Sequence, residues 1–395
     1  MEQNDIVIVA AKRTPMGAML GELSALSAPE LGAIAHIAAI SQAGINPDEI
    51  DEVISGCVLQ AGIGQAPARQ AAIKAGIPTS AGATTINKMC GSGMKAAMLA
   101  HDLILAGSAK MIIASGMESM SNAPYLLSKA RSGYRLGHGE LKDHMFLDGL
   151  EDAYDKGKLM GVFAEATATH FHFSREQQDE FAIQSMNRAL KAIESGAFKE
   201  EIATVTINTR KGDVTVTTDE SPDPAKLSKI AQLKPAFKAD GTVTAANSSS
   251  ISDGAATLIL MSAGQAEKRG IKPIARIVAH ASHSQAPEWF TTAPVDAIRK
   301  VMNKASWKQN DVDLYEINEA FAVVTMAAIT QLELNPEQVN IHGGGCALGH
   351  PIGASGARIL VTLIHALKQQ GKKRGVASLC IGGGEATAMA IELIQ

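Results

Sequence analysis

Short apolar runs alternate with longer amphipathic segments along the chain. Residues 6–10 (IVIVA) are uniformly apolar and predict a buried strand, and residues 53–59 and 111–115 predict two more. Between the first two runs, residues 29–43 predict a helix that Pro29 opens. Strands that alternate with helices in this way indicate a layered α/β protein whose sheets are at least partly parallel.

Two segments far apart in the chain follow the same pattern. Residues 43–51 (AGINPDEID) and 305–313 (ASWKQNDVD) each follow a predicted helix and precede a predicted strand. Farther along, residues 90–93 and 350–356 are glycine-rich turns that each open a helix, and this helix leads to a strand and a second glycine cluster. The repeat predicts a duplicated α/β unit. Coincidence between two ordinary helix–turn–strand units is the alternative.

The pattern changes in the middle of the chain. Residues 119–148 are rich in Gly, Ser, Lys, Arg and His and show little periodicity. Ser174 and Gln177 have the spacing of a capping box, which predicts the start of a long helix. Residues 204–217 predict a β-hairpin. A long irregular stretch of this kind is suited to covering a substrate.

These patterns predict the domain organisation. We expect an N-terminal half over residues 1–270, into which a loop domain of about residues 119–247 is inserted, and a C-terminal half over residues 271–395. A chain of 395 residues is long enough to bury large cores in both halves.

Composition excludes several classes of protein. The 36 basic and 40 acidic residues give a net charge of −4, which disfavours nucleic acid and anionic membrane as partners. With 46% hydrophobic and 19% charged residues, the chain is expected to be globular and ordered. No apolar run approaches the roughly 20 residues that cross a bilayer, and the polar, acidic first residues argue against a targeting segment. We expect a cytoplasmic protein.

The four cysteines are too sparse for a disulfide scaffold and form no CxxC zinc pair, so we expect reduced thiols and no metal site. Cys90 precedes Gly91-Ser92-Gly93 and a predicted helix, whose positive end is expected to lower the pKa of the thiol. Neighbouring backbone N–H groups would suit an oxyanion. Cys90 is therefore a candidate nucleophile, and a small buried packing residue is the equal alternative.

His350 lies in the glycine-rich run of residues 343–356. Glycine lets the backbone bend sharply and approach a ligand closely, and a histidine at such a bend is well placed to activate a thiol. A structural histidine is the alternative. A phosphate-binding loop is disfavoured because the run has neither the P-loop spacing nor GxGxxG.

Cys380 ends a predicted strand and enters a glycine turn, the place where α/β sheets bind ligands. Asn318 follows another predicted strand, where it could cap a helix or orient a water molecule. Cys57 and Cys346 lack comparable surroundings and are interpreted as packing residues.

Four motifs of this chain occur together and in the same order in the thiolase family, which the chain closely resembles over essentially its whole length. They are Cys90 with its glycine turn, NEAF at 318–321, GHPIGASGAR at 349–358 and CIGGG at 380–384. The resemblance implies a duplicated, layered αβαβα fold of α/β class with an inserted covering loop domain. It also implies that the chain interconverts 3-ketoacyl-CoA plus CoA with acyl-CoA plus acetyl-CoA, through an acyl-cysteine and without a metal or redox cofactor.

The resemblance also implies roles for individual residues. Cys90 looks like the acylated nucleophile, His350 like the base that takes its proton, and Cys380 like the acid/base that removes the α-proton of acetyl-CoA. Asn318 is similar to the residue that holds a water which, with His350, forms one oxyanion hole. The N–H groups of Cys90 and Gly382 resemble the other hole.

For coenzyme A, Ser249 matches the family serine that contacts the pantetheine arm. The apolar positions along that arm and the acyl pocket match Leu150, Met160, Phe237 and Phe321, each of which could instead belong to the ordinary core.

Two departures from the family pattern concern substrate binding. Leu159 stands before Met160-Gly161 where many short-chain members have histidine, and residues 219–224 lack the arginine that some relatives use against adenine. Lys226 or Lys229 is a candidate substitute. These changes concern the length of the acyl chain that the enzyme accepts and the binding of the CoA nucleotide.

We therefore expect an acetyl-CoA C-acetyltransferase that condenses two acetyl-CoA to acetoacetyl-CoA plus CoA. A degradative 3-ketoacyl-CoA thiolase of broader chain length is the alternative, and a non-catalytic acyl-CoA-binding protein on the same fold is a third possibility. A nicotinamide dehydrogenase is excluded because no strand leads into GxGxxG. The resemblance implies a homodimer or homotetramer, with residues 119–148 as a tetramer contact.

Overall fold

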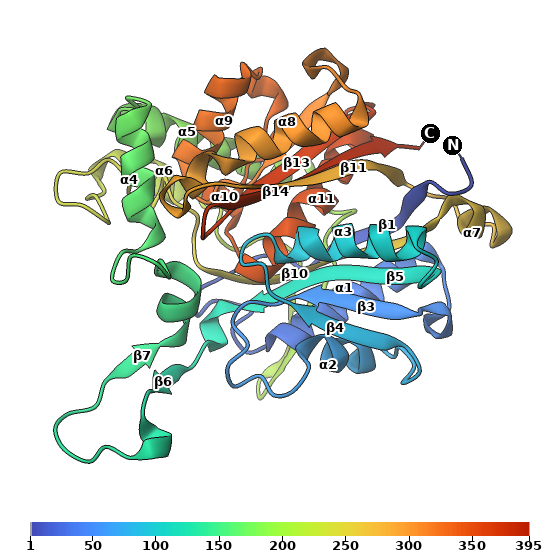
Figure 1. Ribbon diagram of the computed structural model, residues 1–395, viewed down its shortest axis with the longest axis horizontal. Helices are drawn as coiled ribbons and strands as arrows, with labels where there is room; N and C mark the ends of the chain where they lie inside the picture. The colour runs from blue at the N-terminus through green and yellow to red at the C-terminus, as the bar shows by residue number, and fades with distance from the viewer. Residues whose placement is uncertain (1, 395) are drawn as a thin grey trace.

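One large mixed sheet organises the molecule (Figure 1). The computed structural model describes residues 2–394, and ten strands of that range belong to this sheet. They are β1 (Ile6–Arg13), β2 (Gly17–Ala18), β3 (Glu52–Gly56), β4 (Gly82–Ile86), β5 (Met111–Ser119), β10 (Ser252–Ser262), β11 (Ala275–Ser284), β12 (Leu314–Ile317), β13 (Arg374–Ile381) and β14 (Glu385–Leu393). The strand order is β12-β13-β14-β11-β1-β10-β5-β3-β4, and β2 pairs with β10.

The sheet contains the same arrangement twice. In the first half, β5 lies between its parallel neighbour β3 and its antiparallel neighbour β10. In the second half, β13 lies between the parallel β12 and the antiparallel β14. The halves join where β1 pairs with β11 through Val7–Arg276 and Ile8–Ala275. The predicted duplicated α/β unit is confirmed.

Helices cover both parts of the sheet and fill the space between them. The α-helices are α1 (Ala28–Ala43), α2 (Pro67–Lys74), α3 (Ser92–Leu105), α4 (Met160–His170), α5 (Arg175–Ser195), α6 (Pro224–Leu227), α7 (Ala263–Lys268), α8 (Ala293–Ala305), α9 (Ala322–Leu332), α10 (Gly345–Leu348) and α11 (Ile352–Gln369). In Figure 1, α3 and α11 lie between the two parts of the sheet, with α1 and α2 outside the first part and α8 and α9 outside the second. This is the predicted αβαβα layering.

Two glycines let the central helices touch at their N-termini. A Cβ atom on Gly356 of α11 would lie 2.3 Å from the backbone nitrogen of Met94, and one on Gly93 of α3 would lie 2.6 Å from that of Ala357. Real Cβ atoms do not approach so closely, so larger residues would separate the helices. The glycines of both motifs therefore bring the residues just before α3 and α11 together.

Local signals placed several elements correctly. The helix predicted over residues 29–43 is α1, which begins behind a capping box of Ser27 and Glu30 and ends at Gly44 with φ 64°. The capping box of Ser174 and Gln177 opens α5. The predicted hairpin consists of β8 (Val205–Thr209) and β9 (Gly212–Val216).

Two elements differ from their prediction. The strand expected over residues 53–59 ends at Gly56, because the backbone N–H groups of Val58 and Leu59 donate to the Glu118 carboxylate at 3.0 Å instead of to a neighbouring strand. The irregular stretch of residues 119–148 contains a second hairpin, β6 (Tyr125–Leu127) and β7 (Leu141–Asp143), which projects from the body of the molecule (Figure 1). No described helix combines the length and the hydropathy needed to cross a membrane.

Candidate active site

A cavity of about 380 Å³ is lined by residues of both repeated halves and by residues within the range 119–247. Cys90, His350 and Gly382 all line it, although they come from three separate motifs. Most of the remaining lining is apolar. The predicted residues Leu150, Met160, Phe237, Ser249 and Phe321 also line this cavity, as does Leu159.

A tight turn presents Cys90 to the cavity. Met89, the residue before it, has a left-handed φ of 47°, which a non-glycine residue adopts at a cost of about 1–3 kcal/mol. Ser92 holds the turn: its hydroxyl donates to the Met89 carbonyl at 2.6 Å and accepts the Lys88 N–H at 2.8 Å. The nucleophile candidate is thus held in place by its own motif.

Burial dominates the ionisation of Cys90. It raises the pKa of the thiol to about 11, against the opposing effect of hydrogen bonds from the backbone N–H groups of Gly382 and of Cys90 itself. The expectation that the helix end lowers this pKa is therefore wrong: α3 begins only at Ser92, and loss of water outweighs the nearby dipoles. The resting thiol is neutral.

His350 lines the cavity, and one of its ring nitrogens has no hydrogen-bond partner among the described residues. Its Nδ1 lies 2.5 Å from the Ser355 hydroxyl, which in turn donates to the Pro351 carbonyl at 2.9 Å. The hydroxyl therefore accepts the Nδ1 hydrogen, and Nε2, buried and without a hydrogen-bond partner among the described residues, keeps its lone pair. Burial, together with the Arg358 charge, lowers the pKa of His350 to about 3. The imidazole is neutral and can accept a proton at Nε2.

Buried polar side chains lie next to His350 on its Nδ1 side. The Asn318 amide nitrogen lies 3.4 Å from Nδ1, and the Asn318 carbonyl oxygen accepts from Arg358 at 3.3 Å. Arg358 also pairs with Glu316 at 2.9 Å, and both side chains are buried. The alternative that Asn318 caps a helix is wrong, because α9 begins at Ala322 with Phe321 as its N-cap residue.

Cys380 lies beside Cys90 but deeper in the molecule. It is fully buried in β13 and packs in the cluster that contains Met160 and Phe321. Burial raises the pKa of Cys380 well above its usual value, and a charge on Cys90 would raise it further. The two thiols are therefore close enough to influence each other, and both are neutral at rest.

Lys229 lies apart from the other candidates. It lines a second cavity of about 250 Å³, which shares Ala245 and Ser250 with the first. Lys226 lines the same second cavity, and its ammonium group donates to the Ser221 carbonyl at 2.7 Å. Neither lysine lines the cavity that contains Cys90.

Sequence reasoning missed the supporting residues Ser355, Arg358 and Glu118. Ser355 and Arg358 belong to the GHPIGASGAR motif, at one and two helical turns beyond His350, which is the only signal that could have drawn attention to them. Glu118 accepts the N–H of Gly353 at 2.8 Å as well as the N–H groups of Val58 and Leu59. It therefore connects the start of α11 to the segment that follows β3. Cys57 and Cys346, which were interpreted as packing residues, are buried.

Comparison with known proteins assigns the family. The model of the thiolase N-terminal domain matches residues 6–264, and that of the thiolase C-terminal domain matches residues 271–393. The chain belongs to the thiolase family. This thiolase is 49% identical to an acetyl-CoA acetyltransferase of Cupriavidus necator over 98% of its own length and 99% of the relative's. It is 48% identical to acetyl-CoA acetyltransferase 2 of Arabidopsis thaliana over 99% and 97% of the two chains.

Solved structures agree with this assignment. The thiolase superimposes on the acetyl-CoA acetyltransferase of Bacillus anthracis with a TM-score of 0.96, at 43% identity and with 99% of each chain covered. The enzyme of Syntrophomonas wolfei gives the same TM-score at 40% identity, covering 99% of this chain and all of the other.

Proposed function

We propose that this thiolase is an acetyl-CoA C-acetyltransferase, which interconverts two acetyl-CoA with acetoacetyl-CoA plus CoA through an acetyl group carried on Cys90. The observation that carries the proposal is the convergence of Cys90, the free Nε2 of His350 and the Gly382 N–H at one cavity. A thiol accepts an acyl group readily and leaves well from a thioester, so one difficult reaction becomes two easier ones.

In the first step, Cys90 is acetylated. Because the thiol and the imidazole are both neutral, Nε2 of His350 takes the thiol proton as the sulfur attacks the thioester carbonyl. The new C–S bond forms, the bond to the CoA sulfur breaks, and His350 returns the proton to the departing CoA thiolate. The N–H groups of Cys90 and Gly382 stabilise the carbonyl oxygen while it carries negative charge.

In the second step, a carbon–carbon bond forms. Cys380 gives its thiol proton to Nε2 of His350 and, as thiolate, removes the α-proton of a second acetyl-CoA. The resulting enolate attacks the acetyl group on Cys90, and the protonated His350 and a water held by Asn318 are proposed to stabilise the enolate oxygen. The bond from the acetyl carbon to Cys90 then breaks, the Cys90 sulfur takes the proton from His350, and acetoacetyl-CoA is released. Coenzyme A thioesters are the substrates, and no step requires a metal or redox cofactor.

His350→Ala should slow acetylation of Cys90 by at least about 10²-fold, the contribution that a general base makes. In this variant the thiol must ionise without help. Below the Cys90 pKa of about 11, its acetylation rate should therefore rise about tenfold with each pH unit. Stopped-flow measurement of CoA release across pH checks both expectations. Near-wild-type rates in both half-reactions would show that His350 is structural.

The chain-length preference tests the proposed substrate. The kcat/KM for thiolysis should be largest for acetoacetyl-CoA and should fall as the 3-ketoacyl chain lengthens. A nearly constant kcat/KM over longer chains would instead favour the degradative thiolase, an alternative that the apolar side chains of Leu159 and Met160 at the cavity keep open. Transfer of radiolabel from acetyl-CoA to the protein separates both enzymes from a binding protein, which would remain unlabelled.

We also propose that the domains are organised as the sequence predicts. Residues 1–270 and 271–395 act as the two halves, and residues 119–247 cover the cavity. Cys90 from the first half, His350 from the second and Leu150 from the covering stretch line the same cavity, which supports this division.

We propose further that the protein is a homodimer or homotetramer, with the β6–β7 hairpin as the tetramer contact. The hairpin projects from the body (Figure 1) and exposes large apolar side chains, including Leu136, which is 99% exposed, and Leu141 and Tyr125. Sedimentation of the intact protein measures the number of subunits.

The cytoplasm is the proposed location, and neither nucleic acid nor membrane is a proposed partner. All four thiols are free, which suits a reducing compartment.

A further inference from the structure

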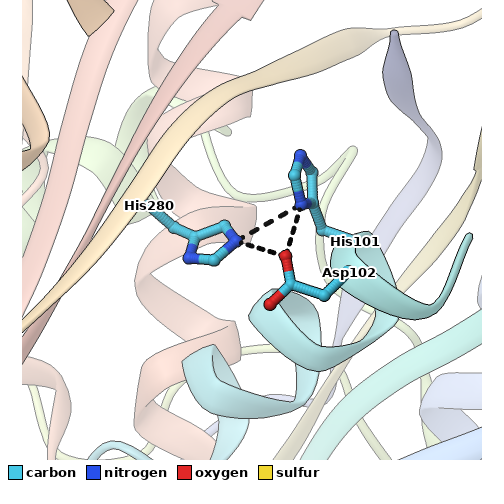
Figure 2. A group of neighbouring side chains, drawn as sticks. All are labelled: His101, Asp102 and His280. Carbon is cyan, nitrogen blue, oxygen red and sulfur yellow. Dashed lines mark hydrogen bonds and ion pairs between the residues drawn. The ribbon is translucent and has the colours of Figure 1, made fainter. Parts of the chain in front are cut away.

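Two histidines and an aspartate converge at one point away from the substrate cavity (Figure 2). His101 and Asp102 lie near the C-terminal end of α3, and His280 lies on β11 in the other half of the molecule. One oxygen of Asp102 is 3.0 Å from Nδ1 of His101 and 2.9 Å from Nε2 of His280, and these two nitrogens are 3.3 Å apart. Three potential ligand atoms thus form a small, nearly equilateral triangle.

The triangle has the dimensions of one face of a metal-coordination tetrahedron. Zinc bonds of about 2.0–2.2 Å to nitrogen and oxygen place the ligand atoms about 3.3–3.6 Å from one another. The observed separations of 2.9–3.3 Å are shorter by a few tenths of an ångström, as expected for groups that hydrogen-bond to one another. A small widening of the triangle would admit an ion.

We propose that Nδ1 of His101, a carboxylate oxygen of Asp102 and Nε2 of His280 bind a divalent transition-metal ion of the zinc type, with water as the fourth ligand. Two imidazoles and one carboxylate favour zinc, cobalt or nickel over magnesium and calcium, which prefer oxygen ligands alone. The carboxylate side chain is 54% exposed, whereas each imidazole is 15% exposed, so water reaches the site from the aspartate side.

The charges at this point suit a cation. Burial lowers the pKa of His280, so its ring is neutral near pH 7, and moving its one hydrogen from Nε2 to Nδ1 would free the Nε2 lone pair for a metal. Burial opposes ionisation of Asp102, but hydrogen bonds from both histidines lower its pKa overall, and it remains an anion. The ammonium group of Lys304 donates to the His280 backbone carbonyl at 3.0 Å, and its charge also lowers the His280 pKa.

An ion held here would connect the two halves of the molecule. Helix α3 begins two residues after Cys90, and Asp102 lies about 15 Å farther along the helix at 1.5 Å per residue. The metal would therefore not touch the reacting groups. It would connect the C-terminal end of α3 to β11. Because the ion would bind only the folded state, it would raise the free energy of unfolding.

Cobalt titration of EDTA-treated protein tests the site. Wild-type protein should bind one equivalent of Co²⁺, with d–d absorption bands typical of a tetrahedral ion. His280→Ala and Asp102→Asn should each weaken Co²⁺ binding at least about tenfold. Loss of a residue that only supports a metal ligand already weakens binding by about 10–100-fold, and loss of a ligand should cost at least as much. Asp102→Asn changes a half-exposed side chain, so it tests the site even if His280→Ala does not fold.

The matched control is His283→Ala. This histidine lies three residues farther along β11, but its ring contacts Gln285 and the Lys300 ammonium group, each at 2.9 Å, which disfavours a bound cation. The control should bind Co²⁺ as wild type does, and Zn²⁺ should raise the melting temperature of wild type and control but not of the two ligand variants. Undiminished binding in both ligand variants, or a thiolate-to-cobalt charge-transfer band from the active-site cysteines as the sole signal, would overturn the proposal.

Discussion

Cys90→Ala is expected to accept no acetyl group from acetyl-CoA and to show no thiolysis of acetoacetyl-CoA. Among the four cysteines, Cys90 alone lines the cavity that also contains His350 and Gly382. Cys380, the nearest other thiol, is fully buried in β13. Without the Cys90 sulfur, no covalent intermediate can form, and the ping-pong route is lost entirely.

Radiolabel from acetyl-CoA, measured on the intact protein by mass spectrometry or scintillation counting, checks this expectation. Cys346→Ala is the matched control because Cys346 is also a free thiol, yet it is buried and does not line the cavity. The control should be labelled as wild type is. Acetyl incorporation in Cys90→Ala at the wild-type level would contradict the assignment and would point to another nucleophile.

Cys380→Ser is expected to separate the two half-reactions. Acetylation of Cys90 requires the Cys90 thiol and His350, so the variant should still be labelled by acetyl-CoA. Removal of the α-proton from the second acetyl-CoA needs a different base, because Cys90 is then acylated. A serine hydroxyl preserves the shape but has a much higher pKa, so it is a poor base near neutral pH. Carbon–carbon bond formation should be lost.

Burial affects the two directions of the reaction differently. The raised pKa of Cys380 keeps its thiol protonated at rest, ready to protonate the enolate that leaves when acetoacetyl-CoA is cleaved. In condensation the thiol must first ionise, and once ionised it is a strong base. Incorporation of solvent deuterium into the methyl group of acetyl-CoA measures this proton removal directly. Exchange at the wild-type rate in Cys380→Ser would mean that another group removes the proton, and His350 would be the first residue to examine.

Local sequence signals were sufficient for much of the fold. Pro29 and the capping box of Ser174 and Gln177 act within a few residues, which is why α5 begins as predicted and α1 begins at Ala28, one residue before its predicted start. Strand–helix alternation and the repeated segments were sufficient for the layered, duplicated architecture, because each half builds the same strand–helix unit. The order of four motifs was sufficient for the family.

Other features depend on groups that meet only after folding. Glu118 ends β3 early because its carboxylate, about 60 residues away in the chain, takes the N–H groups that would have continued the strand. Lys229 lines a second cavity, whereas Ser249 lines the first. Their spacing in the sequence does not show which cavity each of them lines.

The chemistry of the site shows the same contrast. The sequence alone determined that Cys90 stands before a glycine turn and that His350 stands in a glycine-rich bend. The tertiary structure decided their ionisation, because the removal of water that raises one pKa and lowers the other depends on every segment packed around them. It also decided that His280 meets His101 and Asp102, since Asp102 and His280 are 178 residues apart and no local pattern relates them. Short-range hydrogen bonds and apolar periodicity depend on residues that are close in the sequence. The loss of water around a side chain and the meeting of distant side chains depend on how the whole chain packs.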